Sequence, residues 1–226
     1  MRLLAPILLL SLAASADPRI IYSKVFPGSV PASVIITLER DGHGVYKESV
    51  DDSQPLKFVL KQSEADEIFA LAEKLDRFKR PLESGLKVAF MGTKAFQYVD
   101  GTAGPEVKFN YSLDPDAKTI NDWFERMSET EQHFIALERT VKFDKLGAHK
   151  ALLQMNAAME RNRLVALEQF LPLLDRVSKN QSYLNMARER ATLMADWIRN
   201  GAPPESAAAP APPASEEKPA VAAGKP

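Results

Sequence analysis

The spacing of apolar residues changes near residue 114, and this change constrains the fold more than any other feature of the chain. Between residues 33 and 111, β-branched and aromatic residues form short runs in which apolar and polar side chains alternate. From residue 114 to residue 201, apolar residues recur at steps of three and four, as on one face of a helix. Strands followed by helices are typical of the α+β class. We therefore predict an antiparallel sheet with one packed helix in residues 17–113, followed by a helical module in residues 114–201.

A β-hairpin and a third strand are expected at the start of the sheet. The run Val34–Leu38 is β-branched, and a second run, Val45–Val50, follows the segment Asp41–Gly44. The Asp-Gly pair in that segment supplies the positive φ values that a tight turn needs. Leu56–Leu60 places its apolar side chains on one face, which predicts a third strand.

A helix and a second hairpin are expected next. Ser63–Asp66 matches the S-x-x-D capping pattern and predicts a helix from about Glu64 to Phe78. The following Arg80-Pro81 ends it, because a residue before proline is disfavoured in the helical region. The runs 94–99 and 106–111 predict the second hairpin, with a loop at residues 100–105. The apolar residues of 86–90 leave open a short strand before it.

The residues from 114 onward predict several helices. Asp114 and Pro115 are a typical helix start, and the pattern continues to about residue 142. Apolar residues continue beyond Asp144, where we favour a new helix over one very long one. Pro172 either breaks the next helix or lies in its first turn. Gly201 is placed as the C-cap of the last helix.

The two ends of the chain differ from the body. Residues 1–16 have the pattern of a secretory signal peptide: a basic start, an apolar run, and the small residues Ala14-Ser15-Ala16. The apolar run is too short to span a bilayer, so we expect a cleaved signal peptide and not a membrane anchor. Cleavage after Ala16 would leave no integral membrane segment. Residues 202–226 are rich in proline and alanine and are expected to be a disordered tail.

Composition excludes several classes of protein. The chain has 29 basic and 30 acidic residues and a net charge of −1, which argues against nucleic-acid binding. It has no cysteine, which excludes disulfides, thiol catalysis and a lipid carried on cysteine. An exported chain of this size without disulfides is typical of the bacterial envelope, so we expect a periplasmic or secreted bacterial protein.

No pattern in the chain assigns a catalytic, cofactor-binding or metal-binding residue. The three histidines, His43, His133 and His149, lie far apart, and Glu129 with His133 forms only a lone i, i+4 pair. The acidic residues Glu64, Asp66 and Glu67 are expected to complement a helix dipole. The aromatic residues Phe96 and Tyr98 could form a ligand platform, although we favour packing against the helix. Methionines of the helical module could line a binding groove, although core packing explains them better; they are Met155, Met159, Met186 and Met194.

Part of the chain resembles a family of uncharacterised exported bacterial domains. The resemblance covers residues 20–127 and rests on three features: the strand-Asp-Gly-strand unit, the S-x-x-D helix, and the segment from Met91-Gly92-Thr93 through Phe109-Asn110-Tyr111 to Asp114-Pro115. It implies a hairpin, a helix, a further hairpin and a helix, an envelope location, and no known activity. The chain departs from those members that carry cysteines near the start.

Two functions from different classes follow. The preferred hypothesis is a non-enzymatic binding module of the cell envelope that meets a protein partner through its C-terminal helices. The alternative is an envelope hydrolase whose carboxylates converge only in three dimensions. A peripheral membrane protein is disfavoured, because the helices carry acidic and basic residues in balance.

Overall fold

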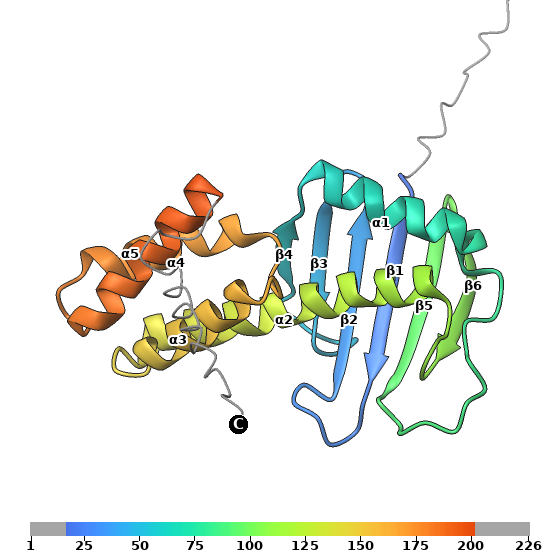
Figure 1. The fold of residues 1–226 in the computed structure, drawn as a ribbon, viewed down its shortest axis with the longest axis horizontal. Coiled ribbons are helices and arrows are strands. Elements are labelled where there is room, and N and C mark those ends of the chain that lie inside the picture. The colour runs from blue at the N-terminus through green and yellow to red at the C-terminus, as the bar shows by residue number, and fades with distance from the viewer. Residues whose placement is uncertain (1–16, 202–226) are drawn as a thin grey trace, which may run out of the picture.

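The computed structural model describes residues 17–201, and this part of the chain contains a six-stranded antiparallel sheet with helices beside and beyond it (Figure 1). The strand order is β4-β3-β2-β1-β5-β6. The strands are β1 (Arg19–Val25), β2 (Ser33–Glu39), β3 (His43–Lys47), β4 (Leu56–Val59), β5 (Thr93–Asp100) and β6 (Thr102–Phe109). The α+β fold with a helical C-terminal part is confirmed. The expected signal peptide and tail lie outside the described residues.

Two long helices cross the same face of the sheet in opposite directions (Figure 1). These are α1 (Gln62–Lys74) and the first half of α2 (Pro115–Phe143). The second half of α2 continues past the β4 edge and packs with the remaining helices there. Those are α3 (Ala148–Glu160), α4 (Leu171–Lys179) and α5 (Asn185–Asn200), with short 3-10 helices η1 (Asp76–Phe78) and η2 (Leu167–Phe170) in the connections.

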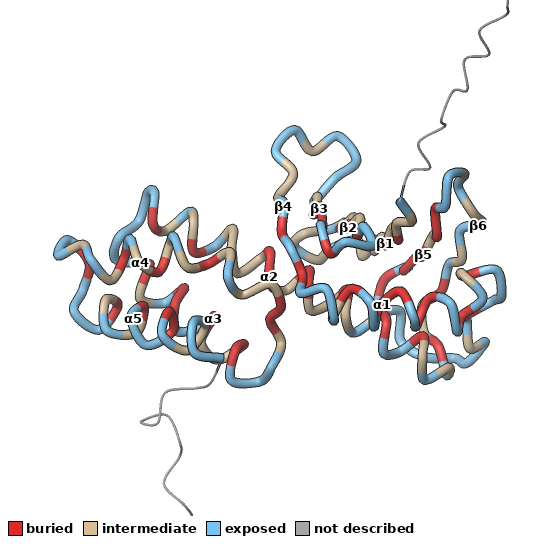
Figure 2. Tube along the Cα trace, turned by 90° about the horizontal axis from the view of Figure 1, so that it is seen from above, coloured by how far each residue is buried: buried red, intermediate tan, exposed pale blue. Residues whose placement is uncertain are grey.

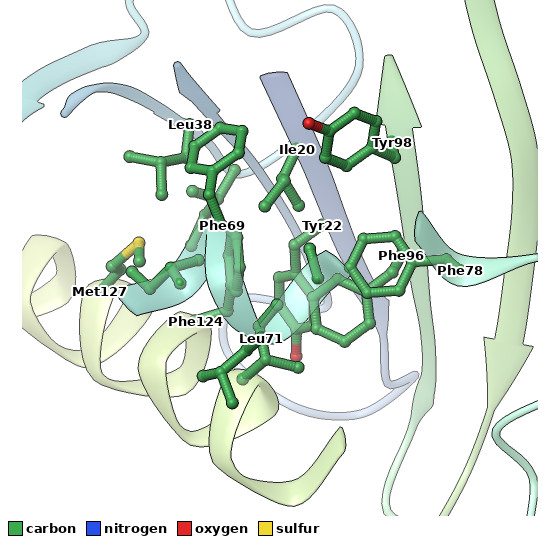
Figure 3. Packing of buried hydrophobic residues seen from close by; sticks show 14 of the residues in the cluster. Ile20, Tyr22, Leu38, Phe69, Leu71, Phe78, Phe96, Tyr98, Phe124 and Met127 are labelled. Carbon is green, nitrogen blue, oxygen red and sulfur yellow. The ribbon is translucent and has the colours of Figure 1, made fainter. Parts of the chain in front are cut away.

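Aromatic side chains fill the core between the sheet and the two helices (Figure 3). Phe96 of β5 lies at its centre, with ring centroids 4.9 Å from Phe78, 5.1 Å from Tyr22 and 5.3 Å from Phe124. Alternation along β1 and β5 places Tyr22 and Phe96 on the helix-facing side of the sheet. No described helix covers the opposite face of the sheet (Figure 1).

The helices beyond β4 have a core of their own. It is formed by α2, α3, α4 and α5 around fully buried residues such as Leu137, Leu152, Phe170 and Leu174. The small residue Ala191 lets α5 approach closely. Buried positions run along both halves of α2 (Figure 2), so this helix belongs to both cores. We call α3, η2, α4, α5 and the second half of α2 the helical arm.

The helix boundaries agree with the local signals in most of the arm. Asp114 caps α2 by accepting a hydrogen bond from the Ala117 amide at 3.1 Å. A separate helix follows Asp144, as expected. Pro172 lies in the first turn of α4, and Gly201 ends α5 with a φ of +69°. Each of these features depends on residues within one turn of the boundary.

The sheet half differs from the prediction in several places. Strand β1 is central to the sheet but was not predicted, β3 begins two residues earlier than expected, and residues 86–90 form no strand. Helix α1 begins at Gln62 because Glu64 accepts a hydrogen bond from the Lys61 amide; the S-x-x-D cap at Ser63 was therefore wrong. It ends at Lys74, because the residues of η1 that follow have positive φ.

Candidate functional site

A cleft of about 320 Å³ separates the sheet from the helical arm. We call it the waist cleft. The end of β4 and the start of α1 form one wall, while η2 and the end of α5 form the other. It is defined by Val59, Lys61, Val165, Leu167, Trp197 and Ile198. The lining side chains are mainly apolar, with charged groups at Lys61, Glu64 and Glu168. Apolar clefts between structural units are common ligand sites.

The segment between α3 and η2 is fastened to α2. The Val165 amide donates a buried hydrogen bond of 2.9 Å to the Thr130 hydroxyl of α2. Arg163 pairs with two carboxylates of the same helix, at 2.6 Å to Asp122 and 3.0 Å to Glu129. The arm is therefore fastened to the middle of α2 beside the waist cleft.

Glu131 is a buried carboxyl group at this junction. Its side chain is 1% exposed, and its Oε1 accepts a hydrogen bond of 2.8 Å from the Gln169 amide of η2. Its Oε2 is buried without a hydrogen-bond partner among the described residues. Burial raises the pKa of Glu131 to about 7, although the Gln169 hydrogen bond opposes the rise. Glu131 lines neither of the two clefts described in this section.

A second cleft, of about 290 Å³, lies between α2 and the β1–β2 loop of residues 26–32. We call it the loop cleft. The loop is held by the Ser29 hydroxyl, which donates to the carbonyl oxygens of Phe26 and Pro31, each at 2.7 Å. Val30 and Pro31 give the loop side an apolar surface. The α2 side is polar and includes Glu125, Ser128 and Glu129.

Charged groups at the floor of the loop cleft are paired. Lys24 donates to both oxygens of Glu125, at 2.8 and 2.9 Å, and the Tyr22 hydroxyl donates to Glu125 at 2.8 Å. Burial, with the negative charge of Glu125, raises the pKa of Tyr22 well above its ordinary value. On the neighbouring strand, burial lowers the pKa of Lys94, whose ammonium group donates to the Asn110 carbonyl oxygen at 2.9 Å.

The three histidines lie apart in the structure, as they do in the sequence. His43 pairs with Asp41 in the β2–β3 turn, and His149 contacts Arg190 between α3 and α5. Burial lowers the pKa of His133, with Glu129 opposing the effect. Within residues 17–201, no group of three or more His, Asp or Glu side chains is placed to hold a metal ion.

Other residues that were considered from the sequence lie mostly in the cores. Phe96 and Tyr98 pack under the helices, which corresponds to the core interpretation that we favoured. Of the four methionines of the helical module, Met155, Met159 and Met194 are buried and Met186 is 54% exposed. Glu64 caps α1, as a first-turn carboxylate should.

The most informative groups were not found from the sequence. Glu131 lies in a polar stretch of α2, and Gln169, which covers it, is 38 residues away. The pair of Lys24 and Glu125 was also not found from the sequence, because these residues are 101 positions apart.

The described helices include none that is long and apolar enough to cross a membrane. Comparisons with protein-family models, with curated proteins and with solved structures found no match for the chain. The function must therefore be argued from the geometry of the chain itself.

Proposed function

We propose that this chain is an exported bacterial binding module, without catalytic activity, that holds a protein partner of the cell envelope in the waist cleft. The observation that carries the proposal is the position of the cleft. It lies where the sheet meets the helical arm, so residues from β4, η2 and α5 can contact one partner together. Export is inferred from the signal-peptide pattern of residues 1–16.

The outer surface of the helical arm supports an interaction role. Large apolar side chains are exposed at the turn from α2 to α3, where Phe143 is 84% exposed and Leu146 is 74% exposed. Further exposed apolar residues lie at Leu153, Leu184, Met186 and Leu193. Exposed apolar residues indicate an interaction site where they are contiguous, and Phe143 and Leu146 are only three residues apart at this turn.

The hydrolase alternative gains no support from the two clefts. General acid and base catalysis needs carboxyl groups that are accessible and have suitable pKa values. In the loop cleft, Glu125 accepts hydrogen bonds from Lys24 and Tyr22, and Glu129 forms a salt bridge with Arg163. The carboxyl group with a raised pKa, Glu131, is buried outside both clefts.

The proposal is tested by native pull-down from envelope extracts with a matched pair of variants. Leu167→Asp places a charge in the waist cleft, whereas Val50→Asp places one on the exposed β3–β4 loop. We expect the wild type and Val50→Asp to retain the same protein and Leu167→Asp to lose it. Circular dichroism checks that both variants are folded. Failure to retain any specific protein, or equal retention by Leu167→Asp, would contradict the proposal.

Export is tested separately by sequencing the N-terminus of the protein from a periplasmic fraction. Cleavage after Ala16 predicts a mature chain that begins at Asp17. An uncleaved chain that stays in the cytoplasm would contradict the proposal that the protein is exported to the cell envelope.

A further inference from the structure

Strand β4 is an edge of the sheet, and its outer side has free main-chain groups. The Leu60 amide donates to the Gly42 carbonyl oxygen at 2.9 Å, which sets the phase of the pairing with β3. Because hydrogen-bonded residues alternate along an antiparallel strand, Leu56 and Phe58 also face β3. The N–H and C=O groups of Lys57 and Val59 therefore point away from the sheet. No backbone hydrogen bond between the described loops and turns uses them.

This free edge opens beside the waist cleft. Val59 and Lys61 line the cleft on the β4 side, and Leu167, Trp197 and Ile198 line it on the arm side. The cleft volume of about 320 Å³ is at the small end of the range for ligand pockets, which suits a few side chains better than a large cofactor. A chain lying along β4 could thus bond to the strand edge and place side chains among apolar residues.

We propose that the waist cleft receives an extended segment of the partner protein, which pairs with β4 as a seventh strand and inserts apolar side chains between β4 and the arm. This inference rests on the proposed function and specifies its partner. An extended polypeptide is the ligand that offers alternating N–H and C=O groups at the spacing of a strand edge. Alternate side chains of such a segment point to opposite faces, so every second residue contacts the apolar cleft.

The charges along β4 favour a partner of a different sequence over a second copy of this chain. Lys57 is exposed on β4, and Lys61 lies two residues after the end of the strand. Pairing of two β4 strands would bring lysines of both copies together, and like charges on paired strands are destabilising. Exposed lysines are also a common means by which edge strands avoid pairing with themselves. The incoming segment therefore carries an acidic residue near Lys57.

The first experiment uses defined peptides. Random heptapeptides displayed on phage are selected on the folded chain, and the enriched sequences are synthesised. We expect enrichment of peptides with alternating apolar residues and an acidic residue. On binding, the amides of Lys57 and Val59 should become protected from hydrogen exchange. Two peptides are then compared, one N-methylated at the odd-numbered amides and the other at the even-numbered amides. Only one of these two sets of amides faces β4, so only one of the two peptides should lose binding.

The matched protein variants are Val59→Pro and Val59→Thr. Proline removes the outward N–H group and leaves the bonds to β3 in place, which edge strands tolerate. Threonine keeps the N–H group and has a similar shape. We expect Val59→Pro to weaken peptide binding by roughly tenfold or more, because one partner group loses its hydrogen bond, and Val59→Thr to change it little. Peptide N-methylation tests the same bonds without altering the protein, should Val59→Pro fold poorly.

Three results would overturn the inference: no enriched peptide, equal binding of the peptide to Val59→Pro and wild type, or a wild-type dimer that Val59→Pro converts to monomer. The last result would assign the edge to a second copy. Pull-down of the envelope partner distinguishes failure of the strand-pairing inference from failure of the proposed function. A partner lost by Leu167→Asp and retained by Val59→Pro keeps the waist cleft as the site and removes the strand pairing.

Discussion

Replacement of Glu131 by glutamine should make the protein more stable at neutral and alkaline pH. The ordinary pKa of a glutamate side chain is 4.5, and burial raises the pKa of Glu131 to about 7. The folded protein therefore holds this proton more tightly than the unfolded chain does. The stability that the proton provides is fully present below pH 4.5 and is lost as the pH rises through about 7.

The size of the effect follows from the two pKa values. A difference between 4.5 and about 7, at about 1.36 kcal/mol per pH unit, corresponds to about 3 kcal/mol of unfolding free energy. Glutamine has nearly the same shape and stays neutral. Glu131→Gln should therefore match the wild type at low pH and exceed its stability by up to about 3 kcal/mol above pH 7.

Urea unfolding, followed by tryptophan fluorescence from about pH 4 to about pH 8, measures the effect. Trp123 and Trp197 report on the sheet side and on the arm. The control is Glu168→Gln, which makes the same chemical change at an exposed residue next to Gln169. Parallel curves for wild type and Glu131→Gln across this pH range would show that the folded protein does not hold the Glu131 proton more tightly than the unfolded chain does.

Two further substitutions test how the fold is held. Thr130→Val leaves the buried Val165 amide without its acceptor and should lower the unfolding free energy by roughly 1–3 kcal/mol. Thr192→Val should cost less in the same urea titration, because the hydroxyl of this exposed threonine only donates to a carbonyl oxygen of its own helix, as the Thr130 hydroxyl also does. A Thr130→Val protein as stable as Thr192→Val would show that this bond does not fasten the arm. Gly44→Ala should destabilise the sheet by roughly 1–3 kcal/mol, because its Cβ would overlap the Phe58 ring; an unchanged melting temperature by circular dichroism would contradict the packing described for β3 and β4.

Local signals in the sequence predicted the start of α2 and the end of α5 well. Asp114 and Gly201 act through hydrogen bonds and backbone angles within one helical turn, so neighbouring residues suffice to recognise them. The central strand β1 was missed although Ile20 and Tyr22 alternate with Ile21 and Ser23. Its partners β2 and β5 come later in the chain, and its burial depends on helices further on still. Strand pairing of this kind is set by contacts that a local pattern does not contain.

The candidate site was harder to predict for the same reason. The waist cleft is lined by residues near positions 60, 165 and 198, which come together only when the arm folds back. Glu131 lies on the apolar face of α2, four residues after Met127 and three before Phe134, but a carboxyl group is rarely buried, so spacing alone did not identify it; the segment around Gln169 covers it. The free edge of β4 requires the strand order to be known, since a strand run looks alike at an edge and in the middle of a sheet.

Because α2 is shared between the two cores, the sheet core and the arm core are joined through one continuous helix. The helix has 29 residues and is therefore about 43 Å long, and its first half supplies Phe124 to the sheet while its second half supplies Leu137 to the arm. Any cut before α2 removes one wall of the sheet core, and any cut within it exposes apolar residues of both cores.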